Sequence, residues 1–167
     1  LNLKIKSRVL EVGPGEGQLL SELSAKFKNL VALDNSQEML EKCKKTISLT
    51  GRKGVEFILG DTSTALNNNI VSDLVIFNMV LHHIPTPAKM FRDAYSLLSV
   101  GGNLLIVDLC SHDQDWVRNS CGDLWLGFEE VDLNHWAKKA KLVAGQSAYL
   151  ALRNGFQIQM RIFRKNI

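Results

Sequence analysis

The sequence lacks most of the features that assign a chain to a specialised class of protein. Its three cysteines, Cys43, Cys110 and Cys121, are odd in number and widely spaced. They form neither a zinc-binding pattern nor a disulfide framework, so no metal site is predicted and a reducing cytoplasm is the expected location. Cys110 and Cys121 are expected to be buried apolar residues.

Long apolar runs and a strong excess of one charge are also missing. No apolar run is long enough to cross a membrane and no leader is typical of a signal peptide, so no membrane partner is expected. The formal net charge is only +3. Lys138, Lys139 and Lys141 are expected to form the solvated face of one helix. Without a basic groove interleaved with aromatic residues, this segment is not expected to bind nucleic acid.

The composition that is present is ordinary for a globular protein. Hydrophobic residues make up 46% and charged residues 22% of the 167 positions. This length and balance suit one domain with a sizeable core. We therefore expect a single domain over residues 1–167.

One stretch near the N-terminus organises the rest of the chain. The apolar run Val9–Val12 predicts a buried parallel strand. Three glycines follow at alternate positions, Gly13, Gly15 and Gly17. A helix is predicted next from apolar residues on one helical face, namely Leu19, Leu20, Leu23 and Phe27. Glycines let the backbone approach a ligand closely, and the helix N-terminus behind them offers free N–H groups.

The glycine spacing separates two kinds of nucleotide site. The dinucleotide fingerprint is G-x-G-x-x-G, whereas here the third glycine comes one residue early and Glu11 stands two residues before the first. This pattern resembles the first motif of the class I S-adenosylmethionine (SAM) methyltransferases. Asp34 closes the apolar run Leu30–Leu33 and matches the acidic residue that the family places after its second strand. A carboxylate there can accept hydrogen bonds from both ribose hydroxyls.

The resemblance implies SAM as the cofactor and a set of residues that contact it. The implied residues are Glu11, Gly13, Gly15, Gly17, Asp34, Asn35, Met39, Asp61, Thr62 and Asn78. Asp61 follows the predicted strand Val55–Leu59, where the family's acidic residue hydrogen-bonds the adenine amino group. A helix N-cap explains Asp61 nearly as well. Asn35 and Ser36 are both good helix starters, and Glu38 stands three residues after Asn35 as in a capping box.

Alternating strands and helices complete the expected fold. Further strands are predicted at Asp73–Phe77, Asn103–Leu109 and Ala148–Leu152. The helix that starts at Thr86 is expected to end at the pair Gly101-Gly102.

The C-terminal part of the sequence narrows the choice of fold further. Asn154-Gly155 predicts a hairpin turn into a strand of alternating residues. The resemblance then implies a Rossmann-like α/β fold with a seven-stranded, mainly parallel sheet that ends in an antiparallel hairpin. The helices that usually cap the family's cofactor at the N-terminal side are missing, so we expect a fragment of a longer protein.

Two adjacent histidines follow the fourth predicted strand. His82 and His83 are candidate catalytic bases, because histidine titrates near neutral pH. Adjacent side chains on a strand or extended loop point to opposite sides, so at most one is expected to face a substrate. Packing or a hydrogen bond to the backbone is the alternative role for each.

The polar and aromatic stretch Ser111–Glu130 is expected to wall a substrate pocket, because it follows the fifth strand at the carboxyl edge of the sheet. Trp116 and Trp125 are pocket candidates, whereas Trp136 is expected in the core. Residues 116–128 are also similar to methyltransferase domains fused behind winged-helix repressors of the arsenic-sensing type. That similarity implies a DNA-binding domain upstream in the full chain.

The resemblance implies methyl transfer from SAM to a small-molecule acceptor. Such an in-line displacement depends on proximity and orientation. A non-catalytic SAM-binding sensor of a transcriptional regulator would share every cofactor residue, so it stays an alternative. An NAD-dependent oxidoreductase is less favoured, because the glycine spacing and the terminal hairpin differ from those of dehydrogenases.

Overall fold

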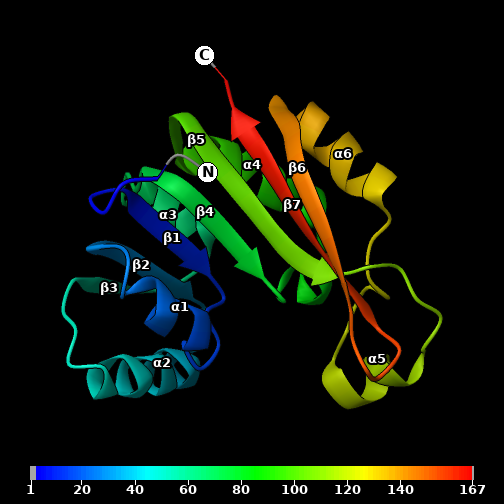
Figure 1. Ribbon diagram of the computed structural model, residues 1–167, viewed down its shortest axis with the longest axis horizontal. Helices are drawn as coiled ribbons and strands as arrows, with labels where there is room; N and C mark the ends of the chain where they lie inside the picture. Colours follow the sequence, from blue (N-terminus) through cyan, green and yellow to red (C-terminus); the bar gives the residue numbers. More distant parts are fainter. Residues whose placement is uncertain (1–2, 167) are drawn as a thin grey trace.

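A seven-stranded sheet with helices on both faces is built by residues 3–166, the part of the chain that the computed structural model describes (Figure 1). The strands are β1 (Arg8–Val12), β2 (Asn29–Asp34), β3 (Val55–Leu59), β4 (Ser72–Asn78), β5 (Leu98–Leu109), β6 (Leu142–Ala151) and β7 (Gln157–Lys165). The helices are α1 (Gln18–Leu23), α2 (Gln37–Leu49), α3 (Thr62–Asn67), the 3-10 helix η1 (Leu81–His83), α4 (Pro87–Leu97), α5 (Trp116–Cys121) and α6 (Glu130–Lys139). No helix among the described residues is both long and apolar enough to span a bilayer.

The strand order is β3-β2-β1-β4-β5-β7-β6. Strands β1 to β5 pair in parallel, and β7 runs antiparallel to both β5 and β6. The hairpin closes at the predicted turn, where Gly155 has a φ of 88° and Leu152 N–H donates to the carbonyl of Phe156. The predicted fold, a mainly parallel sheet with a terminal antiparallel hairpin, is confirmed.

The alternation of side chains along β1 divides the core into two layers. Val9 packs with α1 and α2 through Leu20 and Leu40, whereas Leu10 belongs to the layer under α3, α4 and α6. Helices α4 and α6 lie behind the sheet in Figure 1. Because both faces are covered, β1 is an almost continuous apolar run, as parallel strands require.

Several predicted boundaries are wrong. Helix α4 ends at Leu97, and the pair Gly101-Gly102 lies within β5, which begins at Leu98. Ser72 pairs with Leu98 but Leu74 pairs with Asn103, so the residues between them bulge out of the ladder. Strand β6 begins at Leu142, six residues before the prediction, and carries a second irregularity between Ala144 and Ser147.

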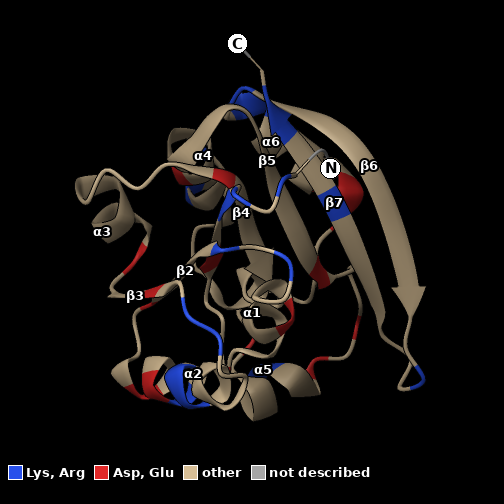
Figure 2. Ribbon diagram, turned by 60° about the vertical axis from the view of Figure 1, so that its left-hand side comes forward, with Lys and Arg blue, Asp and Glu red and all other residues tan. Residues whose placement is uncertain are grey.

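The starts and faces of two helices also differ from the prediction. Helix α1 ends at Leu23 and buries only Leu20. Of the two predicted helix starters, Ser36 caps α2, because its hydroxyl accepts the N–H of Met39 at 3.3 Å. Glu38 makes an ion pair with Lys42 at 2.8 Å instead of closing a capping box. Figure 2 shows acidic and basic residues side by side on α2, as expected of a solvated helix.

The cysteines and tryptophans are placed partly as predicted. Cys43 is buried, but Cys110 is half-buried and Cys121 is exposed, so the prediction that both are buried is wrong. Cys110 directly follows β5 and Cys121 ends the short helix α5, so neither lies in a central strand of the core. Trp136 packs against the core through Phe91 and Phe128. Lys138, Lys139 and Lys141 are all exposed, as predicted, but Lys141 follows the end of α6 and is not part of the predicted helix.

Candidate functional site

A cavity of about 350 Å³ lies at the carboxyl edge of the parallel strands. Predicted site residues among its lining are Gly13, Asp34, Asn35, Asp61, Thr62 and His83. Its remaining lining residues are Val12, Leu33, Gly60, Val80, Ile84, Pro85, Thr86, Lys89 and Met90. Predicted site residues outside its lining are Glu11, Gly15, Gly17, Met39, Asn78 and His82. Ligands of open α/β sheets bind at this edge, so the topology places the cavity where a binding site is expected.

The three glycines differ in what surrounds them. All have a positive φ, of 67° at Gly13, 55° at Gly15 and 82° at Gly17. A Cβ at Gly13 would lie 2.6 Å from a methyl carbon of Val80, and one at Gly17 would lie 2.6 Å from the sulfur of Cys43. Nothing lies within 4 Å of a Cβ built at Gly15. The fold itself therefore requires Gly13 and Gly17, while Gly15 faces open space.

Glu11 is buried beneath the glycine turn. Its side chain is 1% exposed, and among the described residues no group hydrogen-bonds its Oε2. Burial raises the pKa of Glu11 to about 7. A buried carboxyl group with a free oxygen is costly in a core, so this position is expected to serve a ligand or proton rather than packing.

Two of the three predicted cofactor carboxylates, Asp34 and Asp61, line the cavity but differ in burial and hydrogen bonding. Asp34 is half-buried, and its Oδ1 accepts the N–H of Ser36 at 2.8 Å. Asp61 is exposed and caps α3, because it accepts the N–H of Thr64 at 3.1 Å. The hydrogen bond from the Thr64 backbone holds the pKa of Asp61 below its usual value. The capping role left open for Asp61 is thus observed, at a residue that also lines the cavity.

Of the remaining predicted residues, Thr62 lines the cavity, whereas Met39 and Asn78 are not among its lining residues. Thr62 is buried, and its hydroxyl donates to Asp93, which also pairs with Lys89. Met39 and Asn78 are half-buried. The residue after β4, Met79, has a φ of 52°, a conformation that is strained for a side chain of this size and that is common at functional turns.

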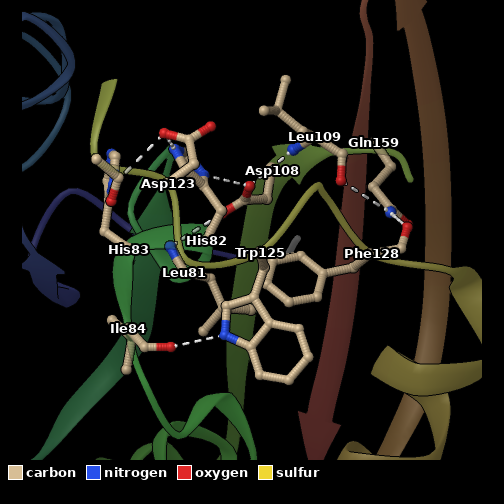
Figure 3. A network of polar contacts seen from close by, with 11 residues as sticks. Leu81, His82, His83, Ile84, Asp108, Leu109, Asp123, Trp125, Phe128 and Gln159 are labelled. Carbon is tan, nitrogen blue, oxygen red and sulfur yellow. Dashed lines mark hydrogen bonds and ion pairs between the residues drawn. The ribbon is translucent and has the colours of Figure 1, made fainter. Parts of the chain in front are cut away.

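The histidine pair is held in a short 3-10 helix, not in an extended strand. The two rings are 4.1 Å apart between centroids, so the prediction that they point to opposite sides is wrong. His82 is buried, with its Nδ1 2.6 Å from Asp108 Oδ1. The side chain of His83 is 41% exposed and lies on the wall of the cavity. Figure 3 shows both rings turned toward Asp123.

Asp108, at the carboxyl end of β5, organises this region. It is fully buried, and its carboxylate also accepts the N–H groups of Leu81 and Leu109 at 2.9 and 2.8 Å. Burial alone would lower the pKa of His82, but the hydrogen bond that His82 makes to Asp108 and the charges of Asp108 and Asp123 raise it overall. Asp108 therefore fixes both the position of η1 and the proton on His82 Nδ1.

The polar segment after β5 folds back over the histidines. Ser111 and His112 donate backbone hydrogen bonds to Phe128 and Leu126, which closes the segment into a loop. The N–H groups of Leu124 and Trp125 both donate to the carbonyl of His82. Trp125 Nε1 also donates to the carbonyl of Ile84 at 2.9 Å (Figure 3). This loop buries Asp123 beside the two rings.

Sequence reasoning missed three residues of this region. Asp108 and Asp123 were not predicted as site residues, and Lys89 lines the cavity without any motif to mark it. An acidic residue near the end of the apolar strand predicted at Asn103–Leu109 was a usable signal for Asp108. Asp123 carries no such signal, because only the return of the loop brings it to His82.

Comparison with known proteins assigns the chain to one family. A family model described as a methyltransferase domain matches residues 3–159. The rice (Oryza sativa subsp. japonica) 2-methyl-6-phytyl-1,4-hydroquinone methyltransferase 2 is 28% identical over 81% of this chain. The Escherichia coli K12 tRNA 5-carboxymethoxyuridine methyltransferase is 27% identical over 64%. The chain spans 38% and 42% of the lengths of these two relatives.

Solved structures share the fold at lower identity. The YcgJ protein of Bacillus subtilis superposes with a TM-score of 0.83 at 14% identity, over 99% of this chain and 94% of its own. The N-methyltransferase NodS of Bradyrhizobium japonicum, solved with S-adenosyl-L-homocysteine, has a TM-score of 0.75 at 15% identity, over 95% of this chain and 78% of its own. Because the family model covers nearly all described residues, the chain belongs to the methyltransferase domain family.

Proposed function

We propose that this domain binds SAM in the cavity and transfers its methyl group to a small-molecule acceptor. The observation that carries the proposal is the cavity itself, which gathers Gly13, Asp34, Asp61 and His83 at the carboxyl edge of the sheet. Membership of the methyltransferase family supports the reaction class. NodS, with a similar fold, was solved with the demethylated form of SAM.

The cofactor would be held by different chemistry at each of its parts. Asp34 still has a carboxylate oxygen free of Ser36, which suits the ribose hydroxyls. Asp61 also lines the cavity and suits the adenine amino group. The open space at Gly15 and the free oxygen of Glu11 suit the charged methionine end. Asn35, Met39, Thr62 and Asn78 complete the proposed contacts.

Methyl transfer from a sulfonium needs an acceptor placed in line with the methyl carbon, and proximity supplies much of the rate. A base is needed only where the acceptor loses a proton. We assign that role to His83, because it borders the cavity, whereas His82 is buried and hydrogen-bonded to Asp108. His82 would act by holding the loop above the acceptor, since its carbonyl accepts two N–H groups of that loop.

A small molecule is the acceptor class that we favour. The rice relative is named for a hydroquinone, whereas the Escherichia coli relative is named for a tRNA nucleoside. No basic stripe borders the cavity here: among its lining residues Lys89 is the one lysine or arginine, and it is paired with Asp93. A polyanion would need several unpaired cations along its path. A SAM-binding sensor within a larger regulator remains the second reading of the same cofactor site.

The test is methyl transfer from labelled SAM to a panel of phenols, quinols and amines, with tRNA as a separate arm. His83→Gln should lower the turnover number on a hydroxyl acceptor roughly 100-fold or more while it leaves SAM affinity nearly unchanged. His135→Gln, at an exposed position of α6, is the matched control. SAM binding without transfer to any acceptor, by the longest available chain, would contradict the enzyme proposal. Transfer to tRNA alone would contradict the acceptor class.

A further inference from the structure

We propose that His82, His83 and Asp123 form a binding site for a divalent transition-metal ion such as Zn²⁺. The three side chains each offer one ligand atom, and these atoms all lie within 4.8 Å of one another. Asp123 Oδ1 is 3.8 Å from His82 Nε2 and 3.7 Å from His83 Nδ1. Bonds of about 2.0–2.1 Å at tetrahedral angles would put ligand atoms about 3.4 Å apart, so the two distances from Asp123 need to shorten by only a few tenths of an ångström.

The buried state of Asp123 is an independent sign of a missing partner. Its side chain is only 4% exposed, and Oδ1 has no hydrogen-bond partner among the described residues. That oxygen points at both histidine rings (Figure 3). An isolated buried carboxylate is expensive, and proteins normally pair it with a cation or a metal. The nearest nitrogens lie too far away for direct hydrogen bonds but suit an ion placed between them.

Asp108 prepares His82 for this role. A carboxylate can only accept, so the 2.6 Å contact places the proton of a neutral His82 on Nδ1. The lone pair of Nε2 is then free, and it is directed toward Asp123. A metal-binding histidine usually donates its other N–H to a carboxylate or carbonyl in this way. The Asp108–His82 pair therefore has the arrangement of a ligand with its supporting group.

The ligand set defines the class of ion. Two imidazole nitrogens and one carboxylate oxygen suit Zn²⁺ or Fe²⁺, whereas Mg²⁺ and Ca²⁺ prefer oxygen ligands. Three protein ligands leave at least one coordination position open. His83 borders the cavity, so that position would be reached from the cavity. His83 Nδ1 must give up its 3.3 Å contact with the carbonyl of Gly122, which is long for a hydrogen bond.

Metal binding and the base role proposed for His83 exclude each other. A nitrogen bound to a cation cannot take a proton, so the base role of His83 belongs to the metal-free form and the ligand role to the metal-loaded form. No metal site was predicted from the sequence, because Asp123 lies 40 positions after His83 and the loop after β5 brings them together.

The test is calorimetric titration of the chelator-treated protein with Zn²⁺, together with the visible spectrum of the Co²⁺-loaded protein. We expect one ion per chain and a Co²⁺ spectrum typical of mixed nitrogen and oxygen ligands. Asp123→Asn and His83→Gln should each weaken binding about 100-fold or more, and Asp108→Asn should weaken it about 10–100-fold. His135→Gln and Cys121→Ser are the matched controls, since both residues are exposed and outside the cluster.

Two kinds of result would overturn the proposal. One is no saturable binding by the folded wild-type protein, which would leave Asp123 bridged to the histidines by water or by a proton. The other is binding that survives His83→Gln but is lost in Cys121→Ser, which would show adventitious binding to a surface thiol. Because His83 is partly exposed, its replacement should leave the fold intact, and circular dichroism checks this even where Asp123→Asn fails to fold.

Discussion

At the scale of single residues, Glu11 combines burial with an unpartnered oxygen. Burial raises its pKa to about 7 from an ordinary 4.5, so between these pH values the folded state holds more protons than the unfolded state. The free energy of unfolding contributed by Glu11 therefore falls as pH rises through this window, by roughly 3 kcal/mol in total.

Replacement of Glu11 by Gln should remove this dependence. The Gln side chain keeps the shape but carries no charge, so Glu11→Gln should be more stable than wild type at about pH 8 and close to it at about pH 5. Urea unfolding at the two pH values measures the difference, and Glu16→Gln, at an exposed position, is the control. An effect of equal size at both pH values would show that Glu11 is already ionised in the folded state.

Asp108 is the second residue whose hydrogen bonds predict an effect on the free energy of unfolding. Asp108→Ala leaves the Leu81 N–H and the His82 ring without an acceptor in a buried site, which should cost about 3 kcal/mol of unfolding free energy. The pKa of His82 is raised in the folded state, so its charged pair with Asp108 stabilises the fold below the unfolded pKa of His82 and is lost as pH rises through the folded value.

The loss in Asp108→Ala should therefore be larger at acidic than at alkaline pH. Chemical denaturation over this range measures it, and NMR titration of the His82 ring should show a lower pKa in the conservative variant Asp108→Asn. Asp115→Ala, at an exposed position of the same polar segment, is expected to change neither quantity. A pH-independent loss would indicate that Asp108 acts on the backbone of η1 alone.

At the scale of elements, the glycine turn between β1 and α1 has two functions that substitution can separate. Gly17→Ala should destabilise the fold by about 2–4 kcal/mol, because the new Cβ would meet Cys43, including its backbone Cα at 3.2 Å. Gly15→Ala meets nothing, so only its left-handed backbone should cost about 1 kcal/mol. Thermal unfolding ranks the two variants.

The order of the two variants should be reversed for SAM binding. Relative to the stability that each variant loses, Gly15→Ala should lose more SAM affinity than Gly17→Ala. A Cβ at Gly15 would extend into the open space of the turn, so SAM affinity should fall although the fold persists. A Gly15→Ala variant with wild-type SAM affinity would remove Gly15 from the proposed contacts and leave the turn as a purely structural feature.

The order of elements followed from the sequence, while their ends did not. Apolar runs such as Val9–Val12 and the turn Asn154-Gly155 are local signals, and both were predicted correctly. The predicted end of α4 was wrong, because the bulge opposite Asp73 is set by pairing with β4 and not by the local glycines. The predicted orientation of the two histidines was wrong for a related reason, since Asp108 on a strand distant in sequence holds the pair in a 3-10 helix.

At the scale of the whole molecule, residues from four strand ends converge on one cavity. The parallel arrangement makes this convergence predictable, and it accounts for Gly13, Asp34 and Asp61. It does not reveal how the loop after β5 returns over the site, and so Asp123 could not be predicted as a neighbour of His82. The similarity of residues 116–128 to repressor-fused domains stays a prediction, as does the upstream DNA-binding domain.

The central claim is that the cavity binds SAM through the carboxylate at the end of β2. Calorimetric titration of the wild-type domain and of Asp34→Ala with SAM tests it most directly, with NAD as the competing ligand. We expect saturable binding of SAM, weaker or no binding of NAD, and a loss of roughly 1–3 kcal/mol in Asp34→Ala, because the ribose hydroxyls lose a charged partner. Unchanged SAM affinity in that variant, or tighter binding of NAD than of SAM by the wild type, would contradict the account.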